Sequence, residues 1–255
     1  MSSTGFQFNM RDAEIVHYVY QLRMATLDHL AALTHRSQKA LERRLPKLRD
    51  ARYLVRLRPR PHKGLYVLGS EGVSVLIEGG YARRELADKR RRETEWKDLL
   101  IPHALLVASI HAKILILCRE SSVNLVDWQH EQPKLCDSVH TPNEGKLPIQ
   151  PDAYFALGER QRHPMHFFLE ADVGTMSHDR IAKKIKAYVA YHQQQLHVKK
   201  FGIPSFQVAV ITQTKARAEN LQAEFHPAMS AAQRRAYHFI SLDALMLDTL
   251  LGNTA

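Results

Sequence analysis

Cysteine is scarce in this chain, and the two that occur, Cys118 and Cys136, form no CxxC pair. Two cysteines are too few for a disulfide scaffold or a cysteine zinc site, so we expect reduced thiols. The 255 residues also lack GxGxxG, P-loop, GxSxG and HExxH motifs. These absences argue against dinucleotide-dependent enzymes, P-loop NTPases, serine hydrolases and HExxH metalloproteases.

Long apolar runs are missing as well. No run approaches the 18 or so apolar residues of a membrane-spanning helix. The first residues, MSSTGFQFNMRDAE, have neither the basic nor the apolar region of a signal peptide. We therefore expect a soluble, cytoplasmic protein with no membrane partner, long enough for two ordinary domains.

Positive charge is abundant and local. The formal net charge is +10, and the segment from Arg36 to Lys63 holds eleven Lys or Arg against two acids, Glu42 and Asp50. Of the +10, +9 therefore falls within 28 residues. Such a surplus attracts polyanions, which leaves nucleic acid, an anionic membrane or an acidic protein as candidate partners.

The order of predicted elements narrows that choice. Helices are expected over 11–24, over 26–34 and from Ser37 onward, with Thr26 and Ser37 as N-caps. Extended segments at 53–59 and 63–69 follow, separated by a turn. Three helices followed by a β-hairpin is the order of a winged helix. We therefore expect a winged helix-turn-helix domain that binds double-stranded DNA.

The third helix carries the predicted DNA-reading surface. Leu41, Leu45 and Leu48 share one of its faces, and cations cluster on the other, as suits a helix in the major groove. Pro46 lacks an N–H, so we expect a kink or an end at Leu45 and base contacts from the residues before it. The residues expected to contact DNA are Arg36, Ser37, Gln38, Lys39, Arg43, Arg44, Lys47, Arg56, Arg58, Arg60 and Lys63.

A segment rich in both charge signs, 81–98, separates the two predicted domains. It has no broad apolar stripe, which indicates an exposed linker helix. It divides a DNA-binding domain at 1–80 from a mixed-sheet domain at 99–255, which makes the chain α/β (α+β). In the second domain we expect a helix at 101–118, strands at 123–128, 152–157, 165–172 and 206–213, a loop at 129–150 and a helix at 177–198.

Carboxylates mark one face of the second domain. If the strands at 152–157 and 165–172 form a hairpin centred on Gln161, Asp152 lies opposite Glu170. One face is then apolar core, and the other carries Asp152, Glu170 and Asp172. Three carboxylates repel one another unless protons or a cation offset them, and such clusters commonly bind Mg²⁺. Asp152 and Glu170 are the candidate Mg²⁺ ligands.

Lys184 is the lysine best placed to approach these carboxylates. It lies about 60° from Ile181, on the inward side of the helix at 177–198. There it would stabilise a charged phosphoryl transition state or pair with Asp172. The alternative is a buried salt bridge at a sheet edge that has no catalytic role.

Three short motifs lie behind the predicted winged helix: Pro151-Asp152, EADVGT from Glu170 and KIKAY from Lys184. In this order they resemble the replication-relaxation family of plasmid and mobile-element proteins, over about 11–213. The resemblance implies a role in plasmid replication and DNA relaxation, and a second domain similar to the PD-(D/E)XK nuclease fold. Asp152 would match its first metal-binding Asp and Glu170 its second acidic ligand. The nuclease pattern has Lys two residues later, where this chain has Asp172.

Two functions follow. In the first, a mobile-element protein acts in DNA replication, relaxation or transfer and nicks DNA as a Mg²⁺-dependent endonuclease. Asp152 and Glu170 would hold the metal that activates water, and Asp172 or Lys184 would assist. In the second, the protein is a transcriptional regulator or a relaxase accessory factor, and an inactive nuclease-like domain mediates dimerisation or contacts replication or relaxase proteins. The intact Asp152, Glu170 and Lys184 favour the enzyme, and Asp172 in the lysine position favours the regulator.

Overall fold

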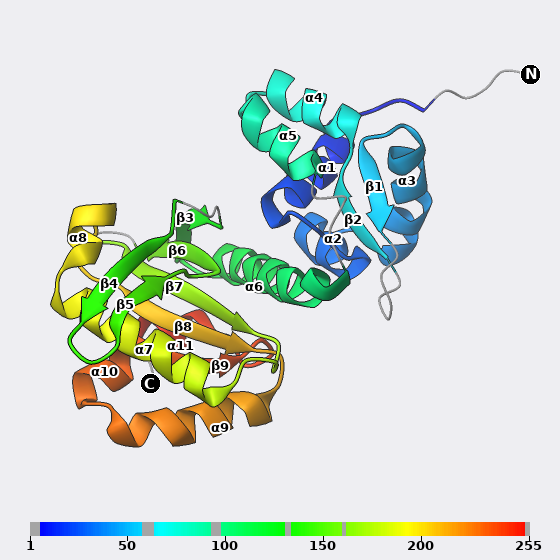
Figure 1. Cartoon of the computed structure of the whole chain (residues 1–255). Coiled ribbons are helices and arrows are strands. Elements are labelled where there is room, and N and C mark those ends of the chain that lie inside the picture. Colours follow the sequence, from blue (N-terminus) through cyan, green and yellow to red (C-terminus); the bar gives the residue numbers. More distant parts are fainter. Residues whose placement is uncertain (1–5, 58–63, 93–97, 131–133, 160–161, 253–255) are drawn as a thin grey trace, which may run out of the picture. The chain divides into compact units, whose positions relative to one another are not determined.

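The structure, a computed structural model of the chain, describes residues 6–57, 64–92, 98–130, 134–159 and 162–252 (Figure 1). The chain forms two compact units, Met1–Ala112 and Lys113–Ala255, here called the N-terminal and C-terminal units. The boundary between the two units along the chain lies within one long helix, α6 (Ile101–Arg119). This point lies C-terminal to the 81–98 segment in which the sequence placed the domain boundary.

The N-terminal unit contains the expected three helices followed by a hairpin. Its elements are α1 (Met10–Leu22), α2 (Leu27–Thr34), α3 (Gln38–Asp50), β1 (Leu54–Leu57), β2 (Leu65–Leu68), α4 (Ser70–Glu78), α5 (Arg84–Arg92), η2 (Asp98–Leu100) and the first part of α6. Strands β1 and β2 pair antiparallel. Both predicted N-caps are confirmed, since the side chains of Thr26 and Ser37 accept backbone N–H groups from the first turns of α2 and α3.

Helix α3 runs through Pro46 to Asp50, so it does not end at Leu45. The side chains of Leu41, Leu45 and Leu48 are at most 1% exposed, which anchors the helix on both sides of the proline. The carbonyl that loses its N–H partner belongs to Glu42, an exposed residue, where water can take the place of that donor. The outward face of α3 therefore extends beyond Arg44 to Lys47.

Helix α5 packs on α4 and β2 and does not stand apart as a linker. Its Ala87 is fully buried. Arg84, Glu85 and Lys89 are exposed, as the sequence predicted. A single small buried side chain produces no apolar stripe, so the packing of this helix was not visible in the sequence pattern.

Helix α6 joins the two units and is strongly apolar. Among the described residues it is the one helix long and apolar enough to cross a membrane by length and composition alone. The sequence predicted this helix at 101–118, but the helix contains no uninterrupted apolar run because His103, His111 and Lys113 lie within it. Core helices of soluble proteins can have the same length and composition.

The C-terminal unit is built on a five-stranded mixed sheet with the order β3-β6-β7-β8-β9. Strands β3 (Asn124–Gln129), β6 (Ala153–Gly158) and β7 (Met165–Asp172) are antiparallel neighbours, and β8 (Gln207–Thr212) and β9 (Tyr237–Ser241) run parallel to β7. The helices are α7 (His178–Gln193), α8 (Leu196–Phe201), α9 (Lys215–Phe225), η3 (His226–Ala228), α10 (Ala231–Ala236) and α11 (Leu247–Leu251). The mixed α/β class with a mixed sheet is confirmed.

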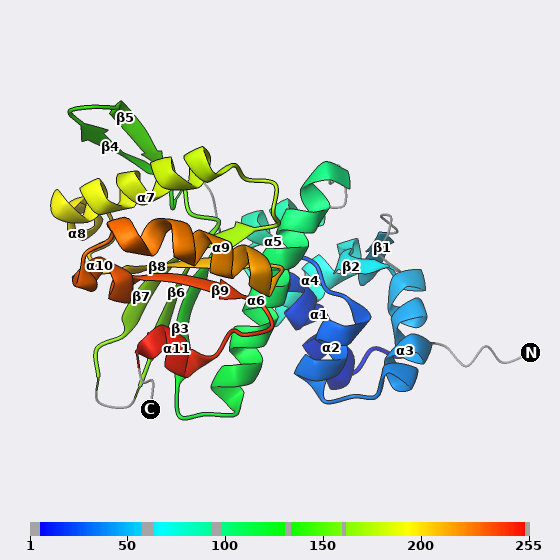
Figure 2. The same ribbon diagram turned by 90° about the horizontal axis from the view of Figure 1, so that it is seen from below.

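Both faces of the sheet are buried. Helices α7 and α9 cover one face, where Tyr188 and Leu221 join Phe168 and Val210 in one apolar core (Figure 2). The opposite face, which carries Phe155 among other apolar residues, is the predicted core and is buried as well. The carboxylates therefore lie on a face that a helix covers.

Two details of the predicted organisation were wrong. The expected loop at 129–150 contains a hairpin, β4 (Asp137–Thr141) and β5 (Gly145–Ile149), which packs on α7. Its prolines hid the strand pattern, although an edge hairpin tolerates proline. The expected single helix at 177–198 is divided into α7 and α8 by Gln195, whose φ of 51° is left-handed.

Candidate functional site

The outward face of α3 carries a row of three exposed cations, Lys39, Arg43 and Lys47. Residues four apart on a helix lie nearly above one another, so the row extends along about 12 Å of the helix. None of the three has an acidic partner in the described part of the chain. The row lies opposite the buried leucines and presents unneutralised positive charge to solvent.

Other predicted DNA contacts are already engaged within the N-terminal unit. Arg36 donates to the carboxylate of Glu14 at 2.5 Å. Gln38 donates to the carboxylate of Asp28 at 2.6 Å, and the Ser37 hydroxyl caps α3. These side chains hold α1, α2 and α3 together. Of the predicted contacts on α3, Lys39, Arg43 and Lys47 have no such partner among the described residues.

Arg44 is the clearest structural residue of the predicted set. Its Nε donates to Oδ1 of Asp12 at 2.7 Å, and its Nη2 donates to Asp12 Oδ2 and, at 2.6 Å, to the carbonyl of Gln7. Asp12 is 1% exposed, and its hydrogen bond raises the pKa of Arg44. The guanidinium carbon of Arg44 lies 4.6 Å from the centre of the Phe6 ring. A sequence pattern cannot separate this arginine from its exposed neighbour Arg43.

The hairpin that the sequence predicted to be a wing is described in part. Arg56 is half-buried on β1, opposite Tyr66. Arg58, Arg60 and Lys63 lie outside the described residues.

In the C-terminal unit, β6 and β7 pair in the register that the sequence predicted. Ala153 lies opposite Leu169, and the N–H of Asp152 donates to the Leu169 carbonyl at 2.9 Å. The Asp152 side chain accepts the N–H of Ala171 at 2.8 Å through Oδ2. Asp152 and Glu170 are therefore brought together at the end of this strand pair.

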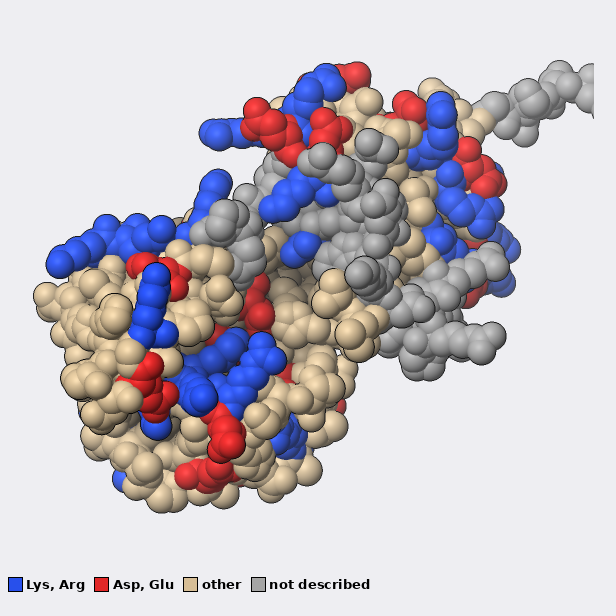
Figure 3. All heavy atoms as spheres, viewed as in Figure 1, with Lys and Arg blue, Asp and Glu red and all other residues tan. Residues whose placement is uncertain are grey.

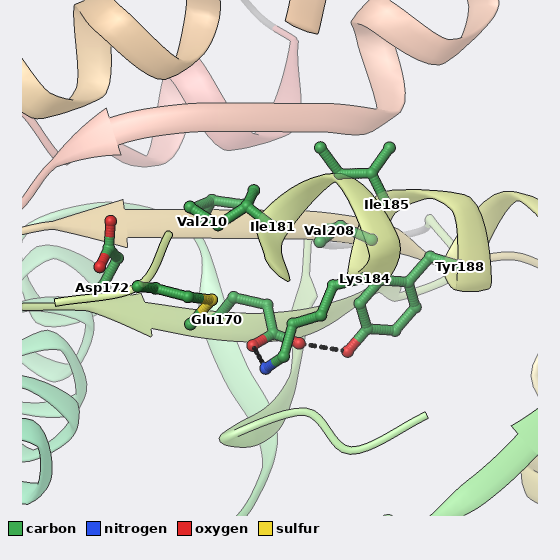
Figure 4. Close-up of a pocket in the computed structure, with 9 residues that line it drawn as sticks. Glu170, Asp172, Ile181, Lys184, Ile185, Tyr188, Val208 and Val210 are labelled. Atoms are coloured by element: carbon green, nitrogen blue, oxygen red, sulfur yellow. Dashed lines mark hydrogen bonds and ion pairs between the residues drawn. The ribbon is translucent and has the colours of Figure 1, made fainter. Parts of the chain in front are cut away.

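Glu170 is the centre of the cluster. Its Oε2 accepts a hydrogen bond from Nζ of Lys184, and its Oε1 accepts one from the Tyr188 hydroxyl at 2.6 Å. Both donors come from α7, as Figure 4 shows. The expected approach of Lys184 to the carboxylates is confirmed, with Glu170 as its partner in place of Asp172. The sequence did not single out Tyr188 as a site residue.

Burial governs the protonation of Glu170. Burial and the nearby charge of Asp152 raise its pKa to about 7, although Lys184 and the Tyr188 hydroxyl favour the ionised form. Burial and the charge of Glu170 in turn raise the pKa of Tyr188 well above its ordinary value. Glu170 is thus a carboxyl group that exchanges its proton near neutral pH.

Asp172 belongs to a different contact. Its Oδ2 accepts from Nε of Arg217 at 2.8 Å, and its Oδ1 accepts the N–H of Gly174 at 2.9 Å. Arg217 also donates to the Met176 carbonyl at 2.6 Å and contacts His178. Figure 4 shows the Asp172 carboxylate apart from the Glu170 cluster. The sequence missed Arg217, because it lies on α9 and only the folded chain brings it to β7.

A narrow cavity lies between β7, β8 and α7, lined by Glu170, Lys184 and Tyr188 among others. Its volume of about 10 Å³ is close to the space that one water molecule needs. The described residues contain no group of three or more His, Cys, Asp or Glu able to hold a metal. Asp152 and Glu170 are two carboxylates, however, and Mg²⁺ commonly binds through one or two carboxylates with its remaining ligands from water or substrate phosphates.

Comparison with known proteins identifies the family. The model of the replication-relaxation family matches residues 16–204, more than half of the chain and parts of both units. Searches of curated proteins and of solved structures gave no match. The match covers α3 as well as Asp152, Glu170 and Lys184. This chain belongs to the replication-relaxation family.

Proposed function

We propose that the protein binds double-stranded DNA through α3 during the replication or relaxation of mobile-element DNA. The observation that carries the proposal is the exposed row of Lys39, Arg43 and Lys47, which has no acidic partner among the described residues and lies opposite the buried leucines of α3. Helices that enter the major groove contact phosphates and base edges from one such exposed face. Membership of the replication-relaxation family supports the process, and the helix and hairpin order supports a winged-helix mode of binding.

The test is DNA binding by the full chain as a function of salt. Replacing Lys39, Arg43 and Lys47 together by Gln is expected to lower affinity at least about 100-fold and to reduce the log–log salt slope by about 3. A matched control replaces Lys199, Lys200 and Arg235 by Gln, which removes the same charges from exposed positions in the C-terminal unit. Equal losses of DNA affinity in the two triple variants would mean that only the overall charge of the chain matters, which would refute the proposal.

A second candidate activity is metal-dependent nicking of DNA by a PD-(D/E)XK-like site. The convergence of Asp152, Glu170 and Lys184 supports it. Bound Mg²⁺ would supply an activated water and a positive charge for the phosphoryl group. Asp152 and Glu170 would hold the ion. Because both carboxylate oxygens of Glu170 already accept hydrogen bonds, Lys184 would have to release Glu170 before the ion could bind. Lys184 would then add its charge to the phosphoryl oxygens.

Relaxation of supercoiled plasmid with Mg²⁺ or Mn²⁺ tests this activity. The wild type is expected to nick, and a variant with both Asp152→Ala and Glu170→Ala is expected to be inactive. Equal activity in both proteins, or none in either, would contradict nicking at this site. A wild type that binds DNA but does not nick it would instead favour a transcriptional regulator or relaxase accessory factor. The pairing of Asp172 with Arg217 also supports that alternative.

A further inference from the structure

The N-terminal half of α7 carries a second concentration of positive charge. Four Lys or Arg occur between 180 and 186, and Asp179 is the one acid of the helix sequence. Lys and Arg side chains gather over α7 in the space-filling view (Figure 3). The charge lies next to the Glu170 cavity, because Ile181 and Lys184 of the same helix line that cavity.

Two of these four cations are neutralised and two are not. Lys184 pairs with Glu170, and Lys186 pairs with Glu144 at 2.6 Å. Arg180 and Lys183 are exposed, and neither has an acidic partner within the ranges that the structure describes. The hydrogen bond from Lys186 lowers the pKa of Glu144, and the charges of Lys186 and Lys183 lower it further. That single carboxylate is already engaged by Lys186, so the ridge keeps a surplus of positive charge.

The order of the cations around the helix places the unpaired ones beside the cavity. At 100° per residue, Arg180 lies about 60° from Lys183 and about 40° from Lys184. The three form a continuous ridge on the side of α7 next to its buried face. The ridge begins in the first turn after Ser177, where the positive end of the helix dipole adds to the charge.

We propose that Arg180 and Lys183 bind backbone phosphates of DNA and hold a strand beside Glu170 and Lys184. The inference rests on the proposed DNA binding and extends it to the C-terminal unit. Arg180 and Lys183 are two long, exposed cations with no acidic partner among the described residues. Such side chains match a phosphodiester backbone, which is recognised by charge and not by base identity. Such contacts position a duplex without specifying its sequence.

The experiment measures binding of the full chain to duplex DNA over a range of salt concentrations. One variant combines Arg180→Gln with Lys183→Gln, and its matched control combines Lys199→Gln with Lys200→Gln on α8, where both lysines are exposed. Each pair removes two positive charges from the C-terminal unit. Loss of two phosphate contacts is expected to reduce the salt slope by about 2 and the affinity by roughly tenfold in the α7 variant only.

The outcomes separate this inference from the function on which it rests. A wild type that binds no DNA refutes both. A wild type that binds, with an α7 variant indistinguishable from wild type or from the α8 control, refutes the phosphate ridge and leaves binding by α3 standing. A fall in slope confined to the α7 variant supports the ridge. Thermal unfolding of both variants checks that these surface substitutions leave the fold intact.

Discussion

Lys184 and Glu170 form an ion pair that joins α7 to β7 across 14 positions of sequence. The side chain of Glu170 is 5% exposed and that of Lys184 is 25% exposed, so the pair has one side in the core and one near solvent. The replication-relaxation chain thus brings a lysine to its central carboxylate from the following helix. The strand position at which a PD-(D/E)XK pattern places that lysine holds Asp172, which pairs with Arg217.

Replacing Lys184 by Met should destabilise the protein by about 2–3 kcal/mol, because it leaves a buried carboxylate without its cation. The effect is expected to be smaller than for a fully buried pair, since Lys184 is partly solvated. Adding Glu170→Gln should restore part of the loss. Urea unfolding of the single and double variants measures this, with exposed Lys183→Met as the control. Equal stability of the two single lysine variants would contradict the prediction.

The stability contribution of Glu170 should depend on pH in a defined direction. Its pKa is raised from 4.5 to about 7 in the folded chain, so the folded state holds the proton more tightly than the unfolded state. The resulting stabilisation is complete below pH 4.5 and is lost as pH rises through 7. A shift of this size corresponds to on the order of 3 kcal/mol.

Glu170→Gln isolates this contribution, because Gln cannot ionise. The stability of the wild type relative to Glu170→Gln should fall between pH 4.5 and pH 7 and then level off. The difference also cancels the histidines that titrate in the same window, among them His29 and His238, whose pKa values burial lowers to about 4. A difference that stays constant with pH would show that Glu170 is not the titrating group.

Arg217 should be more important for stability than its neighbour Lys215. Arg217→Met leaves Asp172, which is 1% exposed, without its cation and is expected to cost about 3 kcal/mol. Lys215→Met breaks an exposed pair with Glu219 at 3.5 Å and should cost less than about 1 kcal/mol. Denaturant midpoints of the two variants test the contrast. Similar midpoints would mean that the Asp172 pair contributes no more than a surface contact.

Arg43 and Arg44 are adjacent residues with opposite expected roles. Arg44→Met removes the partner of buried Asp12 and should destabilise the N-terminal unit by about 3 kcal/mol. Arg43→Met should change stability by less than about 0.5 kcal/mol while weakening DNA binding, because its side chain is exposed and unpaired within the described chain. Thermal melts and DNA titrations of both variants decide this. The prediction is wrong if Arg43→Met destabilises the chain as much as Arg44→Met does.

The hairpin of β6 and β7 shows which features of the candidate site could be predicted from the sequence. Its loop centre and its alternation of apolar residues determine the register, so the placement of Asp152 near Glu170 was predictable. The covering of that face was not, because burial by α7 depends on a parallel crossover between β7 and β8. The same crossover brings Tyr188 to Glu170.

The sequence by itself determined the mixed α/β class, the leucine face of α3, the caps at Thr26 and Ser37 and the register of the hairpin. These are local properties that follow from periodicity, capping residues and turn position. Only the tertiary structure decided which charges are paired. Arg44 is bound to Asp12 and Arg43 is not, and Asp172 is bound to Arg217, because ion pairing depends on distances between elements that no spacing along the chain specifies.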